Sequence, residues 1–195
     1  MNEAHMRFCT SADWQKMLEE LILPGVLNRV DLGRAVVEVG PGPGFTTDVL
    51  CRTADQVIAV EIDPTLAEQL RDRVDGSHVT VILGDAGDTG LERSSQTGAA
   101  SFHMLHHVAT DVDQDRVFEE LFRVLTPGGV LLLADGFDSE GVRAFHEGDT
   151  YNPIDPATLP ARLSAVGFVD IATENHELGW YCCAIVPVSR APLTG

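Results

Sequence analysis

The stretch of sequence that decides the fold is Ala35-Val-Val-Glu-Val-Gly-Pro-Gly-Pro-Gly44. Its valines predict a buried strand over residues 35–39, and the three glycines that follow predict a sharp bend. Residues 45–52 then have the pattern of a short helix, so the bend joins a strand to a helix. Glycines at such a junction permit positive φ angles and let the backbone approach a ligand beside the free N–H groups of the helix. On its own, a glycine-rich bend is weak evidence for a ligand.

Strands and helices alternate along the rest of the chain. The hydrophobic pattern predicts strands at 57–60, 79–83, 99–104 and 130–134, and helices at 64–74, 113–125 and 155–166. The two last strands, 168–173 and 180–186, must pair antiparallel, because a parallel crossover needs about a dozen residues. We therefore predict an α/β fold with a doubly wound, seven-stranded, mostly parallel sheet and one antiparallel strand near its C-terminal edge.

Proline and glycine mark the expected ends of two helices. Residues 11–29 carry Trp14, Met17 and Leu18 at helical spacing, and Pro24-Gly25 is expected to interrupt this helix. Likewise, Pro127-Gly128-Gly129 is expected to end the helix at 113–125 before the next strand begins.

The chain is long enough for one well-buried domain and short for two, and no linker divides it. We expect a single domain over residues 1–195. Its expected parts are a helical cap, an α/β core, a candidate substrate loop and a tail, at residues 1–30, 31–187, 136–156 and 188–195. Phe8, Cys9 and Trp14 of the cap are expected to close over a ligand. The loop is too rich in proline and glycine for a core element, and a simple connection is the alternative.

Charge and cysteine content bear on partners and compartment. Thirteen basic and thirty acidic residues give a net charge of −17, which repels phosphate backbones, so no nucleic-acid partner is expected. No apolar run reaches the roughly 20 residues of a membrane helix, and the start lacks a signal-like stretch. We expect a cytoplasmic protein with no membrane partner. The four cysteines form no CxxC pair, and Cys182 and Cys183 are expected to point to opposite faces of a strand.

Three polar or flexible elements follow three consecutive predicted strands: the glycine bend, Glu61, and Asp85 with Ala86. The carboxyl ends of parallel strands bind ligands, so these elements are expected to share one pocket. A carboxylate such as Glu61 can accept hydrogen bonds from both hydroxyls of a ribose, and Asp85 can accept an adenine amino proton. A dinucleotide-binding turn would place glycine where Phe45 stands, and the two prolines of the bend lack N–H donors for a diphosphate.

The run from Val36 to Asp85 resembles the class I S-adenosylmethionine-dependent methyltransferases. Their acidic-x-Gly-x-Gly-x-Gly motif is matched by Glu38, Gly40, Gly42 and Gly44, and Leu125-Thr-Pro-Gly-Gly129 is similar to their L-x-P-G-G motif. The resemblance implies a Rossmann-like fold that takes S-adenosyl-L-methionine as co-substrate. It also implies roles for the motif residues: Gly40 and Gly42 beside the methionine part, Glu61 on the ribose, and Asp85 with Ala86 at the adenine. Asp63 competes for the ribose role, although its place before Pro64 favours helix capping.

Two branches of the family compete. Residues 36–47 and 57–64 look like the ribosomal RNA adenine dimethyltransferases, but those enzymes carry N-L-P-Y after the fourth strand. Here that stretch reads Ser101-Phe-His-Met-Leu-His-His-Val108, which instead resembles the L-H-H-V of the small-molecule branch. The charge also disfavours RNA. We therefore predict methyl transfer to a small-molecule acceptor. The alternatives are an inactive S-adenosylmethionine-binding partner subunit, an rRNA adenine methyltransferase and a NAD-dependent oxidoreductase.

Three histidines, His103, His106 and His107, are the candidate catalytic residues. An oxygen nucleophile must lose a proton as it is methylated, and a histidine with a pKa near neutrality suits that task. A structural role in a turn is the alternative. A third interpretation is a metal site, since related O-methyltransferases place E-x-x-E-H here and this chain has His103-x-x-His106-His107, with His146 as an outside candidate. Imidazoles suit zinc or iron better than magnesium. We assign no metal ligand from the sequence.

Overall fold

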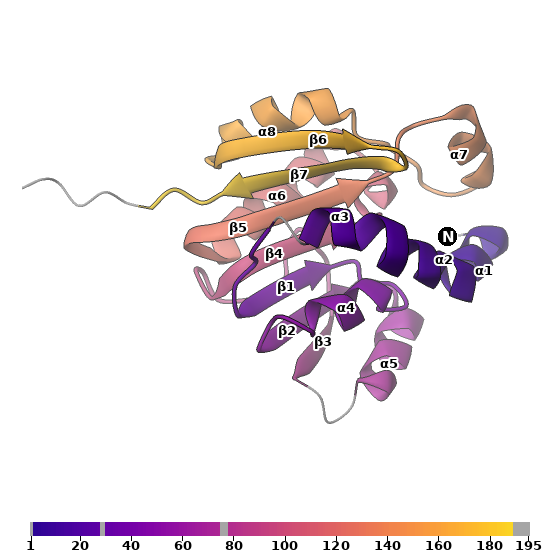
Figure 1. Cartoon of the computed structure of the whole chain (residues 1–195), viewed down its shortest axis with the longest axis horizontal. Coiled ribbons are helices and arrows are strands. Elements are labelled where there is room, and N and C mark those ends of the chain that lie inside the picture. The colour runs from indigo at the N-terminus through magenta and orange to yellow at the C-terminus, as the bar shows by residue number, and fades with distance from the viewer. Residues whose placement is uncertain (1, 28–29, 75–77, 189–195) are drawn as a thin grey trace, which may run out of the picture.

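A seven-stranded sheet forms the centre of the computed structural model, which describes residues 2–27, 30–74 and 78–188. The strand order is β3-β2-β1-β4-β5-β7-β6; β7 runs antiparallel to both neighbours and the other contacts are parallel. The predicted doubly wound sheet with one reversed strand is confirmed (Figure 1). The strands are β1 (Ala35–Val39), β2 (Gln56–Glu61), β3 (Val79–Leu83), β4 (Gln96–Phe102), β5 (Leu125–Asp135), β6 (Val169–His176) and β7 (Gly179–Ile185).

Helices cover both faces of the sheet, and a helical N-terminal segment lies beyond the carboxyl ends of the parallel strands (Figure 1). The α-helices are α1 (Glu3–Cys9), α2 (Ala12–Met17), α3 (Leu23–Leu27), α4 (Phe45–Leu50), α5 (Pro64–Arg73), α6 (Asp111–Val124), α7 (Glu140–Phe145) and α8 (Leu159–Val166). A π-helix, η1 (Leu18–Ile22), and two 3₁₀ turns, η2 (Leu105–His107) and η3 (Pro156–Thr158), complete the elements. None of the helices in the described part of the chain is long and apolar enough to cross a membrane.

The strands alternate their side chains between two apolar cores. Val37 and Val39 of β1 point to the core that contains Phe118 of α6, while Val36 points to the core that contains Leu23 of α3. The same alternation separates the adjacent Cys182 and Cys183: the first is buried and the second is partly exposed, as expected. Neither forms a disulfide.

The expected break at Pro24-Gly25 is wrong, because both residues lie inside α3. In a regular α-helix, Pro24 would leave one carbonyl without its N–H donor, and its ring would clash with the carbonyl four residues earlier. Here α3 continues from the π-helix, whose wider turn is closed by a hydrogen bond from the Leu23 N–H to the Leu18 carbonyl. The helix was also expected to run to residue 29, but residues 28 and 29 lie outside the described part of the chain.

The helix ends before Pro127-Gly128-Gly129, as expected, but the predicted start of the next strand at residue 130 is wrong, because these three residues already lie within β5, which follows α6 directly. Gly128 takes a positive φ of 82°, a conformation in which glycine carries no steric penalty. Its N–H donates to the Val186 carbonyl at 2.8 Å, and the Val186 N–H donates to the Gly129 carbonyl at 3.0 Å. Backbone pairing with Val186, the residue after β7, therefore keeps Pro127-Gly128-Gly129 extended, although this sequence usually forms a turn.

Candidate active site

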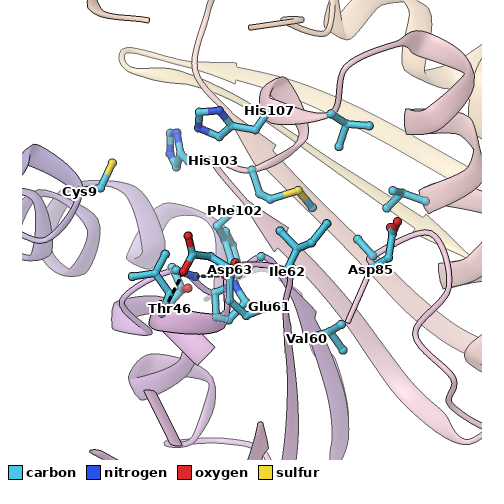
Figure 2. Close-up of a pocket in the computed structure, with 18 of the residues that line it drawn as sticks. Cys9, Thr46, Val60, Glu61, Ile62, Asp63, Asp85, Phe102, His103 and His107 are labelled. Atoms are coloured by element: carbon cyan, nitrogen blue, oxygen red, sulfur yellow. Dashed lines mark hydrogen bonds between the residues drawn. The ribbon is translucent and has the colours of Figure 1, made fainter. Parts of the chain in front are cut away.

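A cavity of about 500 Å³ lies at the carboxyl ends of the first four strands (Figure 2). Gly40 and Gly42 follow β1, Glu61 ends β2, Asp85 follows β3, and His103 follows β4; all five line this cavity. The convergence follows from the topology, because parallel strands that are neighbours in the sheet end along the same edge. The size is within the usual range for a small-molecule site, about 300–1,000 Å³.

The glycine bend forms one wall of the cavity. Gly40, Gly42 and Gly44 all have positive φ, at 68°, 55° and 84°. A Cβ on Gly40 would collide with the side chain of Met104, and one on Gly44 would collide with Leu70. A Cβ on Gly42 would meet no atom within 4 Å, so the space beside this backbone is open toward the cavity. Gly40 and Gly42 line the cavity, whereas Gly44 is not among its lining residues and allows α5 to pack closely.

Glu61 joins the bend to the second strand. Its carboxylate accepts hydrogen bonds from the Gly42 N–H and the Asp63 N–H, both at 2.9 Å. Each oxygen has a further lone pair, so the carboxylate can also accept from ligand hydroxyls. Asp63 caps α5 by accepting from the N–H groups of Thr65 and Leu66, the role that its place before Pro64 favoured.

The third strand contributes the loop of Asp85 and Ala86, and both residues line the cavity. Asp85 accepts a hydrogen bond from the Gly87 N–H at 2.8 Å, which holds the loop in a tight turn. The turn uses only Oδ1 of this carboxylate, so Oδ2 takes no part in holding it. Asp85 therefore both holds the turn and lines the cavity.

Glu38, a candidate cofactor-binding residue, lies beneath the bend and not in the lining of the cavity. The residue is 1% exposed, and its carboxyl group accepts hydrogen bonds from the hydroxyls of Thr46 and Thr47 in α4. Burial raises the pKa of Glu38 to about 7, because its effect outweighs that of the two hydroxyl hydrogen bonds, which lower the pKa. Its position indicates that it supports the strand-to-helix junction from behind.

The N-terminal cap closes the end of the cavity that faces β4. Cys9 and Trp14 line the cavity, as expected, while Phe8 packs against Trp14 with the ring centroids 5.3 Å apart. His103 lies edge-on to Trp14, with the centroids 5.1 Å apart. It has a positive φ of 51°, which is uncommon for a non-glycine residue and which turns the chain out of β4. This end of the cavity is aromatic and carries the imidazoles of His103 and His107.

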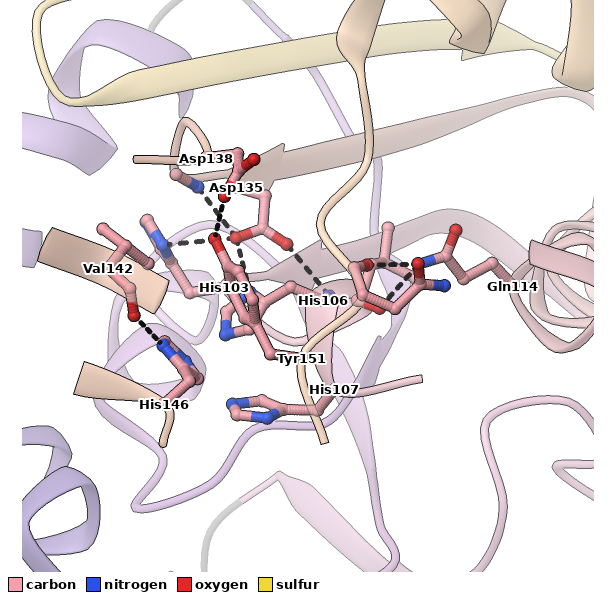
Figure 3. Close-up of polar contacts among 12 residues, drawn as sticks. His103, His106, His107, Gln114, Asp135, Asp138, Val142, His146 and Tyr151 are labelled. Atoms are coloured by element: carbon pink, nitrogen blue, oxygen red, sulfur yellow. Dashed lines mark hydrogen bonds and ion pairs between the residues drawn. The ribbon is translucent and has the colours of Figure 1, made fainter. Parts of the chain in front are cut away.

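His106 takes a different position from its two neighbours. Its ring Nδ1 lies 2.7 Å from Oδ1 of Asp135, the last residue of β5, and it is not among the residues that line the cavity (Figure 3). Asp135 is 3% exposed and also accepts from the Gly136 N–H at 2.8 Å. Nδ1 of His103 lies 3.7 Å from the same carboxylate. The structure therefore brings His103 and His107 to the cavity and places His106 behind them.

The two cavity-lining histidines are uncharged at neutral pH. Burial lowers the pKa of His103 to about 4 and that of His107 to about 3. The expectation of a pKa near neutrality was therefore wrong for both, because it took no account of the desolvation under the cap. A neutral imidazole can still accept a proton, but with a smaller driving force than an imidazole whose pKa is near 7.

Several residues of this region carried no sequence signal. His5 lies in α1, within the expected helical cap but before the one helix predicted there, and Asp149 and Tyr151 lie in the candidate substrate loop. That loop also contains α7, whose N-cap Ser139 accepts from the Val142 N–H. The serine followed by a short helical run was the available signal for this helix.

Comparison with known proteins finds similarity to methyltransferases over the core. Residues 37–133 match the sequence family described as a methyltransferase domain. A ribosomal RNA small subunit methyltransferase A from Phenylobacterium zucineum is 29% identical over 167 residues, which cover 82% of this chain and 58% of that protein. The chain thus spans little more than half the length of this relative, and 38% and 25% of two further curated relatives.

Solved structures agree on the fold. A SAM-dependent methyltransferase from Aquifex aeolicus gives a TM-score of 0.75 at 16% identity, over 95% of this chain and 99% of that one. Phosphoethanolamine N-methyltransferase 2 from Haemonchus contortus, in complex with S-adenosyl-L-methionine, gives 0.74 at 16% identity, over 96% of this chain and 60% of that one. At these identities the likeness supports the architecture and does not identify a substrate.

Proposed function

We propose that this chain is a class I S-adenosylmethionine-dependent methyltransferase and that it transfers a methyl group from S-adenosyl-L-methionine to a small-molecule acceptor, which the match of residues 37–133 to a methyltransferase domain supports. The observation that carries the proposal is the convergence of the glycine bend, Glu61 and Asp85 on one cavity that the helical cap also lines. When bound, S-adenosyl-L-methionine supplies a methyl group that its positively charged sulfur makes electrophilic. The open space beside Gly42 and the free lone pairs of Glu61 fit its amino-acid and ribose parts.

The residues that would hold the co-substrate divide by strand. Gly40 and Gly42 line the part of the cavity for the methionine moiety, with the open space beside Gly42, while Glu61 accepts from the ribose hydroxyls and the turn of Asp85 and Ala86 faces the adenine. Hydrogen bonds to a charged group are worth about 1.5–3 kcal/mol each, so Glu61 is a major source of affinity. The remaining end, under the cap, is where the acceptor binds.

His103 is the candidate general base at the acceptor end. It lines the cavity at the start of the segment that leaves β4, and its Nδ1 lies 3.7 Å from Oδ1 of Asp135. The Asp135 carboxylate stabilises the positive charge that His103 would acquire on accepting a proton from an oxygen nucleophile. Such a base contributes about 10²–10⁴-fold to a rate, and alignment of the reacting atoms supplies about 7–11 kcal/mol. Positioning by the cavity therefore provides most of the rate.

A small acceptor fits both the charge and the shape of the site. The net charge of −17 disfavours the approach of a nucleic-acid backbone. Cys9 and Trp14 of the cap line the acceptor end, so α1 and α2 restrict the space that is available to a large acceptor. A metabolite with a free hydroxyl is the acceptor that this geometry favours.

Ribosomal RNA is the second candidate acceptor, and the similarity to the Phenylobacterium protein favours it. The methyl group of radiolabelled S-adenosyl-L-methionine, followed into a low-molecular-weight metabolite fraction and into purified small-subunit rRNA, separates the two. Label in the metabolite fraction alone is the expected result. Label in rRNA alone would contradict the proposal. Binding of S-adenosylhomocysteine without label in either fraction would support an inactive partner subunit instead.

A further inference from the structure

Four histidines gather behind the acceptor end of the cavity. His5 comes from α1, His106 and His107 from η2, and His146 from the end of α7. One ring nitrogen from each lies within 4.8 Å of those of the other three. The rings also contact one another: the centroids of His106 and His107 are 4.2 Å apart, and those of His5 and His146 are 4.3 Å apart. Three segments that are far apart in the sequence thus bring four imidazoles to one point.

The Nδ1 atom of each ring already has a hydrogen-bond acceptor. Nδ1 of His5 lies 3.1 Å from Oδ2 of Asp149, and Nδ1 of His106 lies 2.7 Å from Oδ1 of Asp135. Nδ1 of His107 and Nδ1 of His146 donate to the carbonyl oxygens of Thr150 at 3.3 Å and of Val142 at 2.7 Å. Carboxylates and carbonyls only accept, so each neutral ring carries its proton on Nδ1. The lone pair of every ring is therefore on Nε2.

These four Nε2 lone pairs cannot satisfy one another, because none of them has a hydrogen to donate. Nε2 of His106 and Nε2 of His146 are buried and have no hydrogen-bond partner. Buried polar atoms usually have a hydrogen-bond partner, and a buried atom left without one destabilises the fold. A cation among the four nitrogens would supply the missing partner. Metal-ligating histidines in general donate their other ring N–H to a carboxylate or a backbone carbonyl, the pattern that all four rings show.

We propose that His5, His106, His107 and His146 bind one divalent transition-metal ion through their Nε2 atoms, and that Zn²⁺ is the ion that fits best. Imidazoles suit Zn²⁺, Cu²⁺ and Ni²⁺, and four of them satisfy the tetrahedral preference of Zn²⁺. Zn–N bonds of about 2.0–2.1 Å place the ligand atoms of a tetrahedron about 3.3 Å apart, so the rings, which now have one nitrogen each within 4.8 Å of the others, would move closer together when the ion binds. Burial lowers the pKa values of His5, His107 and His146, which keeps these rings in the neutral form that binds metal.

The ion would fasten the cap to the acceptor end of the cavity. Four protein ligands leave no open position, which is the arrangement of structural zinc sites. His5 anchors α1, the helix that presents Cys9 to the cavity, and His107 itself lines the cavity. His103, by contrast, is not one of the four, although the sequence pattern His103-x-x-His106-His107 suggested it. Its positive φ directs it toward Trp14 and the cavity.

Metal binding by the purified full chain tests the proposal without any measurement of methyl transfer. After treatment with a chelator and its removal, titration calorimetry with Zn²⁺ is expected to show one site per chain. Co²⁺ is expected to give the intense visible absorption of a tetrahedral complex. His5→Gln and His146→Gln are each expected to weaken Zn²⁺ binding by about 100-fold or more. His78→Gln, an exposed histidine outside the cluster, is the matched control and should bind as the wild type does.

Thermal unfolding separates loss of the site from loss of the fold. Zn²⁺ is expected to raise the melting temperature of the wild type and of His78→Gln, and to leave that of His5→Gln unchanged. Full-affinity binding by both His5→Gln and His146→Gln would overturn the proposal. Octahedral Co²⁺ absorption, or no stoichiometric Zn²⁺ binding by the wild type, would overturn it as well. None of these three results depends on whether the chain transfers methyl groups.

Discussion

Glu38 shows how a motif residue can act from behind the site. Its carboxyl group is buried under the glycine bend, and its pKa rises from an ordinary 4.5 to about 7. Between these values the folded protein holds a proton that the unfolded chain has released. The contribution of this group to stability is therefore complete below pH 4.5 and is lost as the pH rises through 7.

Replacement of this carboxyl group by an amide tests that account. In Glu38→Gln nothing titrates at this position, so the stability of the wild type relative to the variant is expected to fall by about 3 kcal/mol between pH 4.5 and pH 8. Urea unfolding of both proteins across that range measures the difference. A difference that does not change with pH would mean that Glu38 is ionised throughout.

The role of His103 can be tested without added backbone strain. Its φ is 51°, and asparagine is one of the few residues that adopt this region readily. His103→Asn is expected to lower kcat by about 10²–10⁴-fold through loss of the base. The affinity for S-adenosylhomocysteine should stay unchanged, because Glu61 and the bend are untouched. Turnover at the wild-type rate would remove His103 from the mechanism.

Sequence reasoning identified the cavity-lining residues that short motifs mark. The glycines, Glu61 and Asp85 were found because each follows a predicted strand, and the topology then brings strand ends together. His5 was missed because a lone histidine in a short N-terminal run has no pattern. Its position depends on contacts with His107 and Asp149, over 100 residues away, which only the folded chain supplies.

At the scale of elements, the glycine bend needs glycine for two reasons: its residues have positive φ, and the space beside Gly42 is open to the cavity. Gly42 and Gly90 both have positive φ, 55° and 70°, and a Cβ on either would meet no atom within 4 Å. The two alanine variants should therefore lose similar stability, about 1–2 kcal/mol each. Gly42→Ala alone is expected to weaken S-adenosylhomocysteine by about tenfold or more, because its methyl group enters the cavity. Calorimetry on the pair checks this, and equal losses of affinity would contradict it.

Strand and helix positions were predictable wherever local pattern and tertiary context agree. The strand at 79–83 and the antiparallel last pair were found from hydrophobic runs and a short connection. The errors at Pro24-Gly25 and Pro127-Gly128-Gly129 share one cause. In each, the structure accommodates residues that usually end an element, through a feature that the local sequence does not reveal. At Pro24 this feature is the wide turn of the π-helix, and at Gly128 it is backbone pairing with Val186.

At the scale of the whole molecule, the site exists because the sheet is parallel over its first five strands. The order β3-β2-β1-β4 places the carboxyl ends of the first four strands of the chain along one edge of the sheet. The cap lies over that edge (Figure 1). The glycine bend, Glu61 and the Asp85 turn are held together by this arrangement, with the Gly42 N–H bound directly to the Glu61 carboxylate. The central claim is that this edge binds a single adenosyl ligand.

Calorimetric titration with S-adenosylhomocysteine tests that claim most directly. The wild type is expected to bind one molecule per chain, and Glu61→Ala to bind about 10- to 150-fold more weakly, the range of a charge-assisted hydrogen bond. Glu68→Ala, on the exposed face of α5, is the matched control and should bind as the wild type does. Equal affinities of the wild type and Glu61→Ala, or binding of NAD in place of S-adenosylhomocysteine, would contradict the account.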